Sequence, residues 1–298
     1  MPKSQSGTSI AVLVTCFNRR ETTLSCIERL RKQTFFSTVY LVDDGSSDGT
    51  SDAIRATFPD VKIYSGDGNL YWAGGMRLAF SEALKTGHDY YLWLNDDTIL
   101  FEDAIERLIK THNELLDGGQ GHTIVVGSVQ DPATKKLTYG GRVKTKKLLS
   151  FKDQPVEPGS QPVRCDLFQG NIVLIPQEIA GAVGNIDSAF THNFGDLDYA
   201  FRTVNLGYSI WIAPGYMGEC PQNSVSGSWV DMSLSPIARL KKVSQIKNFP
   251  LYAWTTYVRR HAGFFWFLLW PLPYVRALIG YRDLDDSPTF SKMSSGDK

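Results

Sequence analysis

Short apolar runs alternate with amphipathic helical patterns along most of the chain. A continuous apolar run is typical of a strand that is buried on both faces of a sheet, whereas apolar residues spaced three and four apart predict a helix with one buried face. The first pattern predicts strands at residues 10–15, 39–42, 61–64, 90–94, 123–129 and 209–213. The second predicts helices at residues 21–30, 50–58, 73–84, 102–116, 178–183 and 197–204. Ser47, Asp48 or Thr50 is the expected N-cap of the helix at 50–58.

This alternation predicts an α/β fold with a mostly parallel, Rossmann-like sheet flanked by helices, because right-handed crossovers place helices on both faces. Ligands bind beyond the carboxyl ends of the strands in such sheets. Polar side chains follow three of the predicted strands at that edge: Thr15 and Asn18, then Asp43 and Asp44, then Asn95, Asp96 and Asp97. We therefore expect three separate segments to converge on one candidate site.

The later part of the chain changes in composition. Residues 131–160 are rich in Lys, Gly and Pro, which predicts a hairpin or a flexible insertion, and order resumes over residues 163–176. From Ser233 onward basic and aromatic residues dominate. We expect a main domain over residues 1–232 and a C-terminal helical appendage over residues 233–298.

Charge and cysteine usage exclude several functions. The 298 residues contain 31 Lys and Arg and 31 Asp and Glu, so no net field attracts nucleic acid. Four scattered cysteines without a CxxC pair predict a reducing compartment and no zinc finger. The N-terminal residues lack a secretory signal pattern, so a cytoplasmic location is expected. Two prolines and Arg276 interrupt the apolar stretch at 262–279, which favours lying on a membrane over crossing one.

The strongest single motif is residues 94–97, with the sequence LNDD, at the end of an apolar run. Two carboxylates at a strand end bind a hard cation such as Mg²⁺ or Mn²⁺, and the cation neutralises a diphosphate. The motif therefore predicts a clamp for a diphosphate. The alternative is that Asp96 or Asp97 caps the following helix, and the motif alone leaves both interpretations open.

A second acidic motif is the turn at residues 43–48, with the sequence DDGSSD. A carboxylate there can accept hydrogen bonds from a nucleobase N–H or from ribose hydroxyls, while Gly45 brings the backbone close to a ligand. An ordinary acidic turn with a helix cap is the alternative. The neighbouring motifs favour the binding role.

The third motif is residues 193–202, with the sequence NFGDLDYAFR. If Asp196 begins a helix, its carboxylate is expected to lie exposed at the N-terminal end, where it can act as a base toward a hydroxyl. The alternative is a capping Asp196 beside an i,i+4 ion pair between Asp198 and Arg202. We expect both, with Asp198 paired to Arg202 and Asp196 free.

Together these motifs resemble glycosyltransferase family 2, whose members have the GT-A fold and invert the anomeric carbon. The resemblance is greatest to its bacterial rhamnosyltransferase-like and galactofuranosyltransferase-like branch. It extends over residues 10–214, about two thirds of the chain. The matching segments are residues 14–19 (VTCFNR), 42–48 (VDDGSSD), 69–79, 94–98 (LNDDT) and 195–202 (GDLDYAFR).

The resemblance implies a role for each matching residue. Asp43 or Asp44 contacts the nucleobase, and Asp196 deprotonates the acceptor. Asp97 ligates Mg²⁺ or Mn²⁺, with Asp96 beside it. The other implied donor-binding residues are Thr15, Phe17, Asn18, Arg19, Asn69, Trp72, Gly74, Arg77 and Asn95. The residues assigned to the acceptor or to a secondary role are Asp198, Arg202 and His192; for His192, a satisfied loop histidine is the alternative.

Three departures from the family pattern bear on the metal and the donor pocket. Asn95 replaces the usual first aspartate of the metal motif, which predicts a more loosely held cation. Gly195 replaces a glutamate, and Tyr71-Trp72 replaces glycine and phenylalanine, which reshapes the donor pocket.

A late histidine often completes the metal site of this fold, but residues 218–224 read GECPQNS. Glu219 or Cys220 is the candidate substitute, and because thiolates suit Mg²⁺ poorly, a structural role for Cys220 is favoured. Trp93 and Trp211 are expected in the core, while Trp72 is either core or a stacking residue.

The resemblance implies transfer from TDP-rhamnose or a UDP-sugar to a lipid-linked glycan in bacterial surface polysaccharide, such as the O-antigen of lipopolysaccharide or capsule. A nucleotidyltransferase or a non-catalytic nucleotide-sugar-binding protein stays open as the alternative. The basic and aromatic residues after Ser233 suit the surface of an anionic membrane. Packing on the main domain or on a second subunit of a homo-oligomer is the equal alternative.

Overall fold

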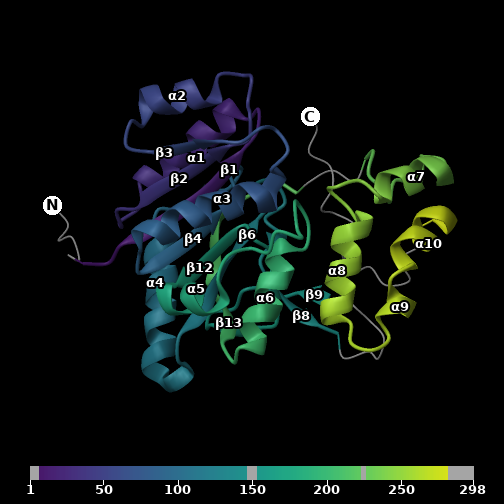
Figure 1. Cartoon of the computed structure of the whole chain (residues 1–298). Helices are drawn as coiled ribbons and strands as arrows, with labels where there is room; N and C mark the ends of the chain where they lie inside the picture. Colours follow the sequence, from purple (N-terminus) through teal and green to yellow (C-terminus); the bar gives the residue numbers. More distant parts are fainter. Residues whose placement is uncertain (1–6, 146–152, 223–225, 281–298) are drawn as a thin grey trace.

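The computed structural model describes residues 7–145, 153–222 and 226–280. Over these ranges the chain forms a central sheet between two layers of helices, followed by a group of helices at one side (Figure 1). The α/β architecture expected from the alternation of strands and helices is therefore confirmed.

The central sheet contains ten described strands. Their bounds are β1 (Ile10–Cys16), β2 (Thr38–Asp43), β3 (Lys62–Ser65), β4 (Tyr90–Leu94), β5 (Ile99–Leu100), β6 (Thr123–Gln130), β7 (Leu137–Tyr139), β10 (Val163–Cys165), β12 (Ile172–Pro176) and β13 (Ser209–Glu219). The main order is β10-β13-β6-β12-β4-β1-β2-β3, with β5 on β13 and β7 on β6. Along this order only β10 and β12 run against the other six strands, so the sheet is mostly parallel.

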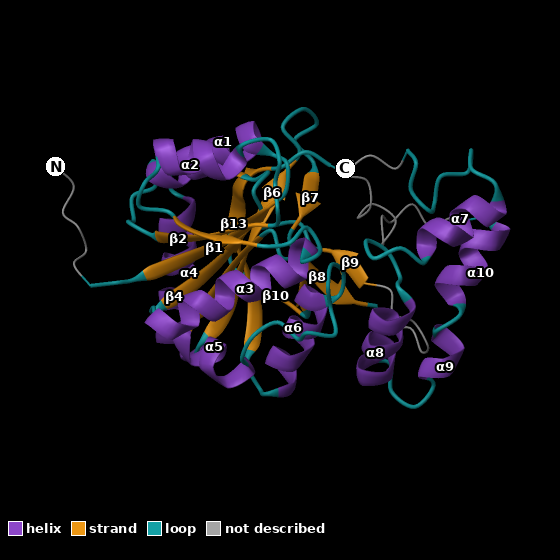
Figure 2. Cartoon of the chain, turned by 45° about the horizontal axis from the view of Figure 1, so that its top comes forward, coloured by secondary structure: helices purple, strands orange, loops and turns teal. Residues whose placement is uncertain are grey.

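The helices cover both faces of this sheet (Figure 2). One face carries α1 (Arg20–Arg31), α2 (Thr50–Thr57) and α4 (Ala104–Leu115, continued by η1, Leu116–Gln120). The other face carries α3 (Tyr71–Thr86), α5 (Gln177–Val183) and α6 (Gly195–Asn205). Successive residues of β1 serve opposite faces, because Val12 packs in the first layer and Leu13 in the second. This double burial explains why the strand reads as a continuous apolar run.

The strand β12 was not expected from the sequence. It inserts antiparallel between β4 and β6, where Val173 pairs with Trp93 on one side and Val126 on the other. The apolar run at residues 172–175 was its signal. An apolar run does not show which strands lie beside it or whether it runs parallel or antiparallel to them.

Residues 131–160 contain a hairpin, which is one of the two alternatives expected from the sequence. A small second sheet has the order β11-β8-β9, with β8 (Gly141–Lys144), β9 (Asp153–Pro155) and β11 (Leu167–Phe168). The strands β8 and β9 pair antiparallel, and residues 146–152 between them lie outside the described residues.

Two finer expectations were wrong. The N-cap of α2 is Gly49, in the left-handed region at φ 77°, and not Ser47, Asp48 or Thr50. The Asp48 carboxylate still serves this helix end, because it accepts a hydrogen bond from the Thr50 N–H at 3.0 Å. Trp93 is fully buried as expected, but Trp211 is only half-buried, because its side chain points to the face of the sheet opposite to that of the buried Ile210 and Ile212.

Between residues 233 and 280 the structure describes four helices: α7 (Pro236–Val243), α8 (Leu251–His261), α9 (Trp266–Leu269) and α10 (Leu272–Ile279). The helix α8 packs against α6 and the residue before it. The Tyr257 ring stacks on Phe194 at 4.9 Å between centroids, and the His261 ring stacks on Phe201 at 4.3 Å. Phe194, Phe201 and Tyr257 belong to the same apolar cluster as α3 and the sheet. The boundary between residues 232 and 233 stays a prediction.

None of the described helices combines the length and the apolar character needed to traverse a bilayer.

Replacement of Tyr257 by alanine should lower the free energy of unfolding by about 3–5 kcal/mol, the usual cost of deleting a large buried aromatic ring. Tyr257 is 1% exposed and lies between α8 and Phe194. Urea denaturation of the full chain measures the change. The matched control is Tyr252→Ala on the same helix, whose side chain is 73% exposed and whose loss should cost under about 0.5 kcal/mol. Equal effects of the two substitutions would contradict the packing of α8 on α6.

Candidate functional site

A cleft of about 530 Å³ lies beyond the carboxyl ends of β1, β2 and β4. Most of the residues singled out from the sequence line it: Thr15, Phe17, Asn18, Arg19, Asp44, Asn69, Trp72, Asn95, Asp96, Asp97, His192 and Asp196. The other five are absent from its wall: Asp43, Gly74, Arg77, Asp198 and Arg202. The three loops expected to converge therefore do so, together with the start of α6.

The loops after β1 and β2 hold each other through Asn18. The Asn18 N–H donates to the Ser46 hydroxyl at 2.8 Å, and the Asn18 Oδ1 accepts from the Ser47 N–H at 2.7 Å. Asn18 adopts φ 50°, in the left-handed region that asparagine tolerates better than most residues. The motif at residues 14–19 thus contributes to the wall and to the shape of the next loop.

The two acids of the DDGSSD turn have different positions. The Asp43 carboxylate stays within its own turn, where it accepts from the Ser46 N–H at 2.9 Å and from the Ser51 hydroxyl. The Asp44 carboxylate lines the cleft and accepts from the N–H groups of Gly68, Leu70 and Tyr71 at 2.9–3.2 Å. Asp43 therefore stabilises its own turn, and of these two acids only Asp44 lines the cleft.

Arg19 bridges the two acids of the LNDD motif. Its Nη1 lies 3.0 Å from the Asp96 Oδ1 and 2.9 Å from the Asp97 Oδ2. Burial raises the pKa of Asp96, an effect that the Arg19 guanidinium opposes and the Asp97 carboxylate reinforces. Neither acid caps a helix, because the N-cap of α4 is Asp103.

Asn95 and Trp72, two departures from the family pattern, contact each other. The Trp72 Nε1–H donates to the Asn95 Oδ1 at 2.8 Å. The Trp72 ring also lies against Gly170, where an added Cβ would stand 2.4 Å from the ring. Trp72 is thus part of the cleft wall, and the Asn95 oxygen already has a partner.

Glu219 and Cys220, the two candidates for a further metal ligand, do not complete a metal site. Glu219 forms an ion pair with Lys135 at 2.6 Å and is absent from the cleft wall. The Cys220 Sγ lies 3.6 Å from the Asp97 Oδ1, but burial raises the pKa of this thiol to about 12, so it remains protonated. Within the described residues no group of three or more His, Cys, Asp and Glu side chains could hold a metal ion. Asp96 and Asp97 alone fit a cation that takes its remaining ligands from water and a diphosphate, as Mg²⁺ commonly does.

Asp196 lies at the start of α6 and faces the cleft with a buried carboxylate. Its side chain was expected to be exposed, and that is wrong: the residue is 5% exposed because α6 begins beneath Gly170 and Trp72. The Oδ2 accepts from the Gly170 N–H at 3.0 Å and the Oδ1 from the Leu197 N–H at 2.9 Å. Burial raises the pKa of Asp196 to about 6, against the lowering effect of these N–H donors.

Asp198 points away from the cleft. Its Oδ2 accepts from the Arg202 Nε at 2.8 Å, which confirms the expected i,i+4 ion pair. Its Oδ1 lies 2.9 Å from the His261 Nε2 and 3.3 Å from the Arg260 Nη1, both on α8. The Arg202 guanidinium also donates to the carbonyls of Val183 and Asn185. Asp198 and Arg202 therefore hold α6 against its neighbours and do not line the cleft.

Two residues of the segment at 69–79 also serve the fold. The Arg77 guanidinium donates to the Phe190 carbonyl at 3.1 Å and so ties α3 to the loop before α6. Gly74 is buried within α3, and its N–H donates to the Thr191 carbonyl. The close approach that requires a glycine is one residue later, since a Cβ on Gly75 would stand 2.1 Å from the Thr15 Oγ1.

His192 lines the cleft as a neutral side chain. Burial, together with the charge of Lys247, lowers its pKa to about 4. Its Nδ1 accepts a hydrogen bond from the backbone N–H of Trp72 at 3.4 Å, and its ring packs edge-on to Tyr71. It is a partly satisfied loop histidine that also borders the site.

Six wall residues were missed by the sequence: Gly68, Tyr139, Gln169, Gly170, Asn171 and Lys247. Three more, Cys16, Tyr71 and Asn193, lie within the motifs but were not listed as site residues. Tyr71 and Phe194 stand in the left-handed region, at φ 52° and φ 72°. Such backbone positions in non-glycine residues concentrate at functional sites, but a sequence does not show them. Lys247 comes from the connection between α7 and α8, which no motif links to the cleft.

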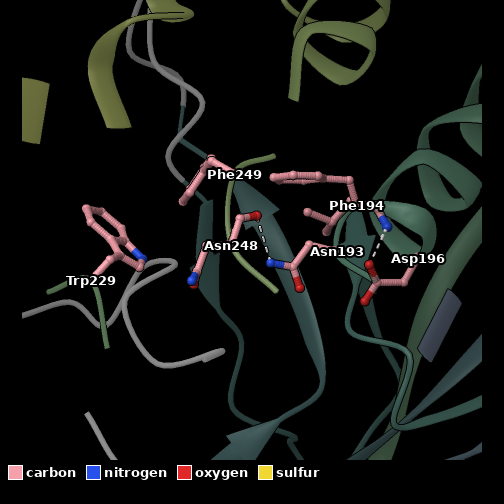
Figure 3. A pocket seen from close by; sticks show the side chains of 7 residues that line it. Asn193, Phe194, Asp196, Trp229, Asn248 and Phe249 are labelled. Carbon is pink, nitrogen blue, oxygen red and sulfur yellow. Dashed lines mark hydrogen bonds between the residues drawn. The ribbon is translucent and has the colours of Figure 1, made fainter. Parts of the chain in front are cut away.

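A small pocket adjoins the cleft at Asn193 and Asp196 (Figure 3). Trp229, Asn248 and Phe249 supply its other side. The Asn193 Nδ2 donates to the Asn248 carbonyl at 2.9 Å, which fastens the loop before α6 to the segment before α8.

The chain matches the family described as Glycosyl transferase family 2 over residues 11–172, more than half of its length. Uncharacterized proteins of Mycobacterium tuberculosis and Mycobacterium bovis are 23% identical over 212 residues, which represent 68% of this chain and 70% of theirs.

Two solved glycosyltransferases have a similar fold. The mannosyltransferase PcManGT from Pyrobaculum calidifontis, in complex with GDP-Man and Mn²⁺, matches with a TM-score of 0.56 at 15% identity, over 91% of this chain and 73% of that one. GalNAc-T7 with UDP, GalNAc and Mn²⁺ matches with a TM-score of 0.55 at 14% identity, over 70% of this chain and 42% of that one. The expected GT-A fold is thereby confirmed.

Replacement of Arg19 by glutamine should tighten the binding of Mn²⁺ to the nucleotide-free protein by about two- to tenfold, since it removes a partly exposed cation that competes for Asp96 and Asp97. Isothermal titration calorimetry measures the dissociation constant. Arg20→Gln is the matched control, because this neighbouring arginine contacts Glu21 and should leave Mn²⁺ binding unchanged. An Arg19→Gln protein that binds Mn²⁺ no better than the wild type would contradict the competition.

Proposed function

This chain belongs to glycosyltransferase family 2, and we propose from that premise that it transfers a sugar from a nucleotide-diphosphate sugar to a hydroxyl of a glycan acceptor. One observation carries the proposal: the buried carboxylate of Asp196 lines the same cleft as the acidic pair Asp96 and Asp97. A cleft that combines a diphosphate clamp with a nearby base has the two parts that glycosyl transfer to a hydroxyl requires.

Asp196 is the proposed base. Two backbone N–H groups fix both carboxylate oxygens, so the side chain keeps one orientation toward the cleft. Its raised pKa, about 6, makes it a better proton acceptor than an ordinary aspartate while it remains ionised at neutral pH. A single displacement by an acceptor hydroxyl that this base activates inverts the configuration of the anomeric carbon.

Asp97, with Asp96 beside it, is the proposed holder of Mg²⁺ or Mn²⁺. When bound, the cation would neutralise charge on the departing nucleotide diphosphate. The cation must share the acids with Arg19 or displace it, because the guanidinium contacts both carboxylates. On the other side of the cleft, Asp44 is the proposed contact of the nucleobase, and Trp72 borders the space between Asn95 and Asp196.

We further propose a donor of the TDP-rhamnose or UDP-sugar type and an acceptor in bacterial surface polysaccharide. Support comes from the motifs shared with the rhamnosyltransferase-like and galactofuranosyltransferase-like branch. The proposed location is the cytoplasm with peripheral contact to the inner face of the membrane, where a lipid-linked acceptor is available. Four free, buried cysteines agree with a reducing compartment.

A non-catalytic nucleotide-sugar-binding protein is the second candidate function. The occupation of both acids by Arg19 and the amide at Asn95 favour it. Donor hydrolysis in the absence of acceptor separates the two candidates. Complete absence of hydrolysis with every donor and metal tried would argue for the binding protein. The nucleotidyltransferase alternative finds no support in the family match.

A thermal-shift screen against UDP-, TDP-, GDP- and CMP-sugars, each with and without Mn²⁺, tests donor binding. We expect one nucleotide series to raise the stability in a metal-dependent manner, by about 2.7 kcal/mol when the ligand is present at about one hundred times its dissociation constant. Asp97→Ala is the control and should abolish the part of the shift that depends on Mn²⁺. No shift with any donor would contradict the proposal.

Replacement of Asp196 by asparagine should lower kcat by roughly 10²–10⁴-fold and leave the donor-induced thermal shift intact, because the base is lost while the donor site remains.

In the wild type, kcat/KM should rise with pH up to about 6 and then level off, since only the ionised form of Asp196 accepts a proton. Steady-state kinetics with a soluble acceptor measure both effects. Near-full activity of Asp196→Asn would exclude Asp196 as the base.

A further inference from the structure

The C-terminal helices expose an unusual number of large apolar side chains. Among the described residues, five such side chains are exposed over residues 7–231, but thirteen over residues 232–280. Eight of the thirteen lie between residues 264 and 279, the segment of α9 and α10. We refer to these eight side chains as the apolar face. Within α10, three of them recur at helical spacing, at Leu272, Val275 and Ile279.

The segment that carries the apolar face is itself well anchored. Leu269 and Ala277 are buried on its opposite side. The Trp254 Nε1–H of α8 donates to the Trp270 carbonyl at 2.8 Å, and the Arg239 Nε of α7 donates to the Ala277 carbonyl at 2.8 Å. The exposed side chains therefore belong to ordered helices with a second, buried side. A patch of this kind on an ordered surface marks an interaction site.

The segment that carries this face has basic but no acidic residues, although Arg260 within it pairs with Asp187 and Asp198 from outside the segment. Residues 232–281 contain seven Lys and Arg and no Asp or Glu, although the whole chain is neutral. Lys241 and Arg259 are exposed, and the Arg259 guanidinium lies 5.8 Å from the Trp266 ring. A surface that combines apolar, aromatic and basic residues matches the boundary between the acyl chains and the headgroups of an anionic membrane.

The same basic charge disfavours a second copy of this chain as the partner that covers the apolar face. A symmetric contact would place this acid-free segment against itself and bring exposed cations such as Lys241 and Arg259 toward those of the other copy. Spanning a bilayer is also excluded for α9 and α10, which have 4 and 8 residues. We propose that the apolar face inserts into the surface of an anionic phospholipid bilayer, with α9 and α10 lying in the plane of the interface.

This contact would orient the cleft. The helix α8 lies between α9–α10 and α6 (Figure 1), and the segment before α8 supplies Lys247 to the cleft wall. A bilayer at the apolar face therefore brings lipid-borne acceptors to the side of the protein that carries Asp196. Only this consequence rests on the proposed transfer reaction, because binding to a bilayer requires neither donor nor acceptor.

Co-sedimentation of the full chain with vesicles tests the proposal. We expect binding to vesicles of phosphatidylcholine mixed with phosphatidylglycerol, weaker binding to phosphatidylcholine alone, and loss of the difference at high salt. Phe264→Asp combined with Leu268→Asp should weaken binding by at least about tenfold, because two inserted apolar groups are replaced by anions. Lys241→Gln combined with Arg259→Gln should reduce the preference for phosphatidylglycerol.

Phe36→Asp is the matched control, since Phe36 is 77% exposed on the loop before β2 and Phe264 is 82% exposed. This control should bind vesicles like the wild type, and all variants should keep the wild-type melting temperature. Equal vesicle binding by the wild type and the Phe264→Asp/Leu268→Asp protein would overturn the proposal. So would a failure of the wild type to bind, or a vesicle-free dimer that Phe264→Asp/Leu268→Asp dissociates, because the apolar face would then be a subunit interface. None of these outcomes bears on donor binding or transfer.

Discussion

The carboxylate of Asp198 has no exposure to solvent, and the position of the candidate site depends on how its charge is compensated. Arg202 comes from the same helix, while Arg260 and His261 come from α8. A buried charge is tolerated only when it is paired, so α6 and α8 have to stay together. Asp196 stands two residues before Asp198 on α6. The ion pairs that neutralise Asp198 therefore also fix the position at which Asp196 meets the cleft.

The cleft itself is held by polar contacts that cross between loops. The Asp44 carboxylate accepts from two backbone N–H groups of the loop before α3 and from the first N–H of that helix, and the Asn95 Oδ1 accepts from the Trp72 Nε1–H. Two departures from the usual family pattern thus form a single contact. We interpret Asn95 and Trp72 as one compensated change, in which the amide supplies an acceptor for an indole N–H without adding a third negative charge beside Asp96 and Asp97.

The sequence predicted those site residues that directly follow a strand, because the apolar pattern shows where each strand ends. Asp97 and Asp44 follow buried strands, and parallel strands bring their carboxyl ends to one edge. Side-chain direction was not predictable in the same way. Arg77 matches a donor-loop position but reaches a carbonyl 113 residues along the chain, and Lys247 enters the cleft from the opposite end of the chain. The burial of Asp196 was also missed, because it arises from Gly170 and not from its own helix.

The stacking of Phe194 on Tyr257 has a consequence for how this protein can be recombined with its relatives. Phe194 precedes the helix that bears Asp196, while Tyr257 belongs to the C-terminal helices. A chimera that imported the C-terminal helices of another enzyme would have to import partners for Phe194 and Asp198 with them. A substitution at Tyr257 therefore changes the packing of the helix that bears Asp196, although the two residues lie in different parts of the chain.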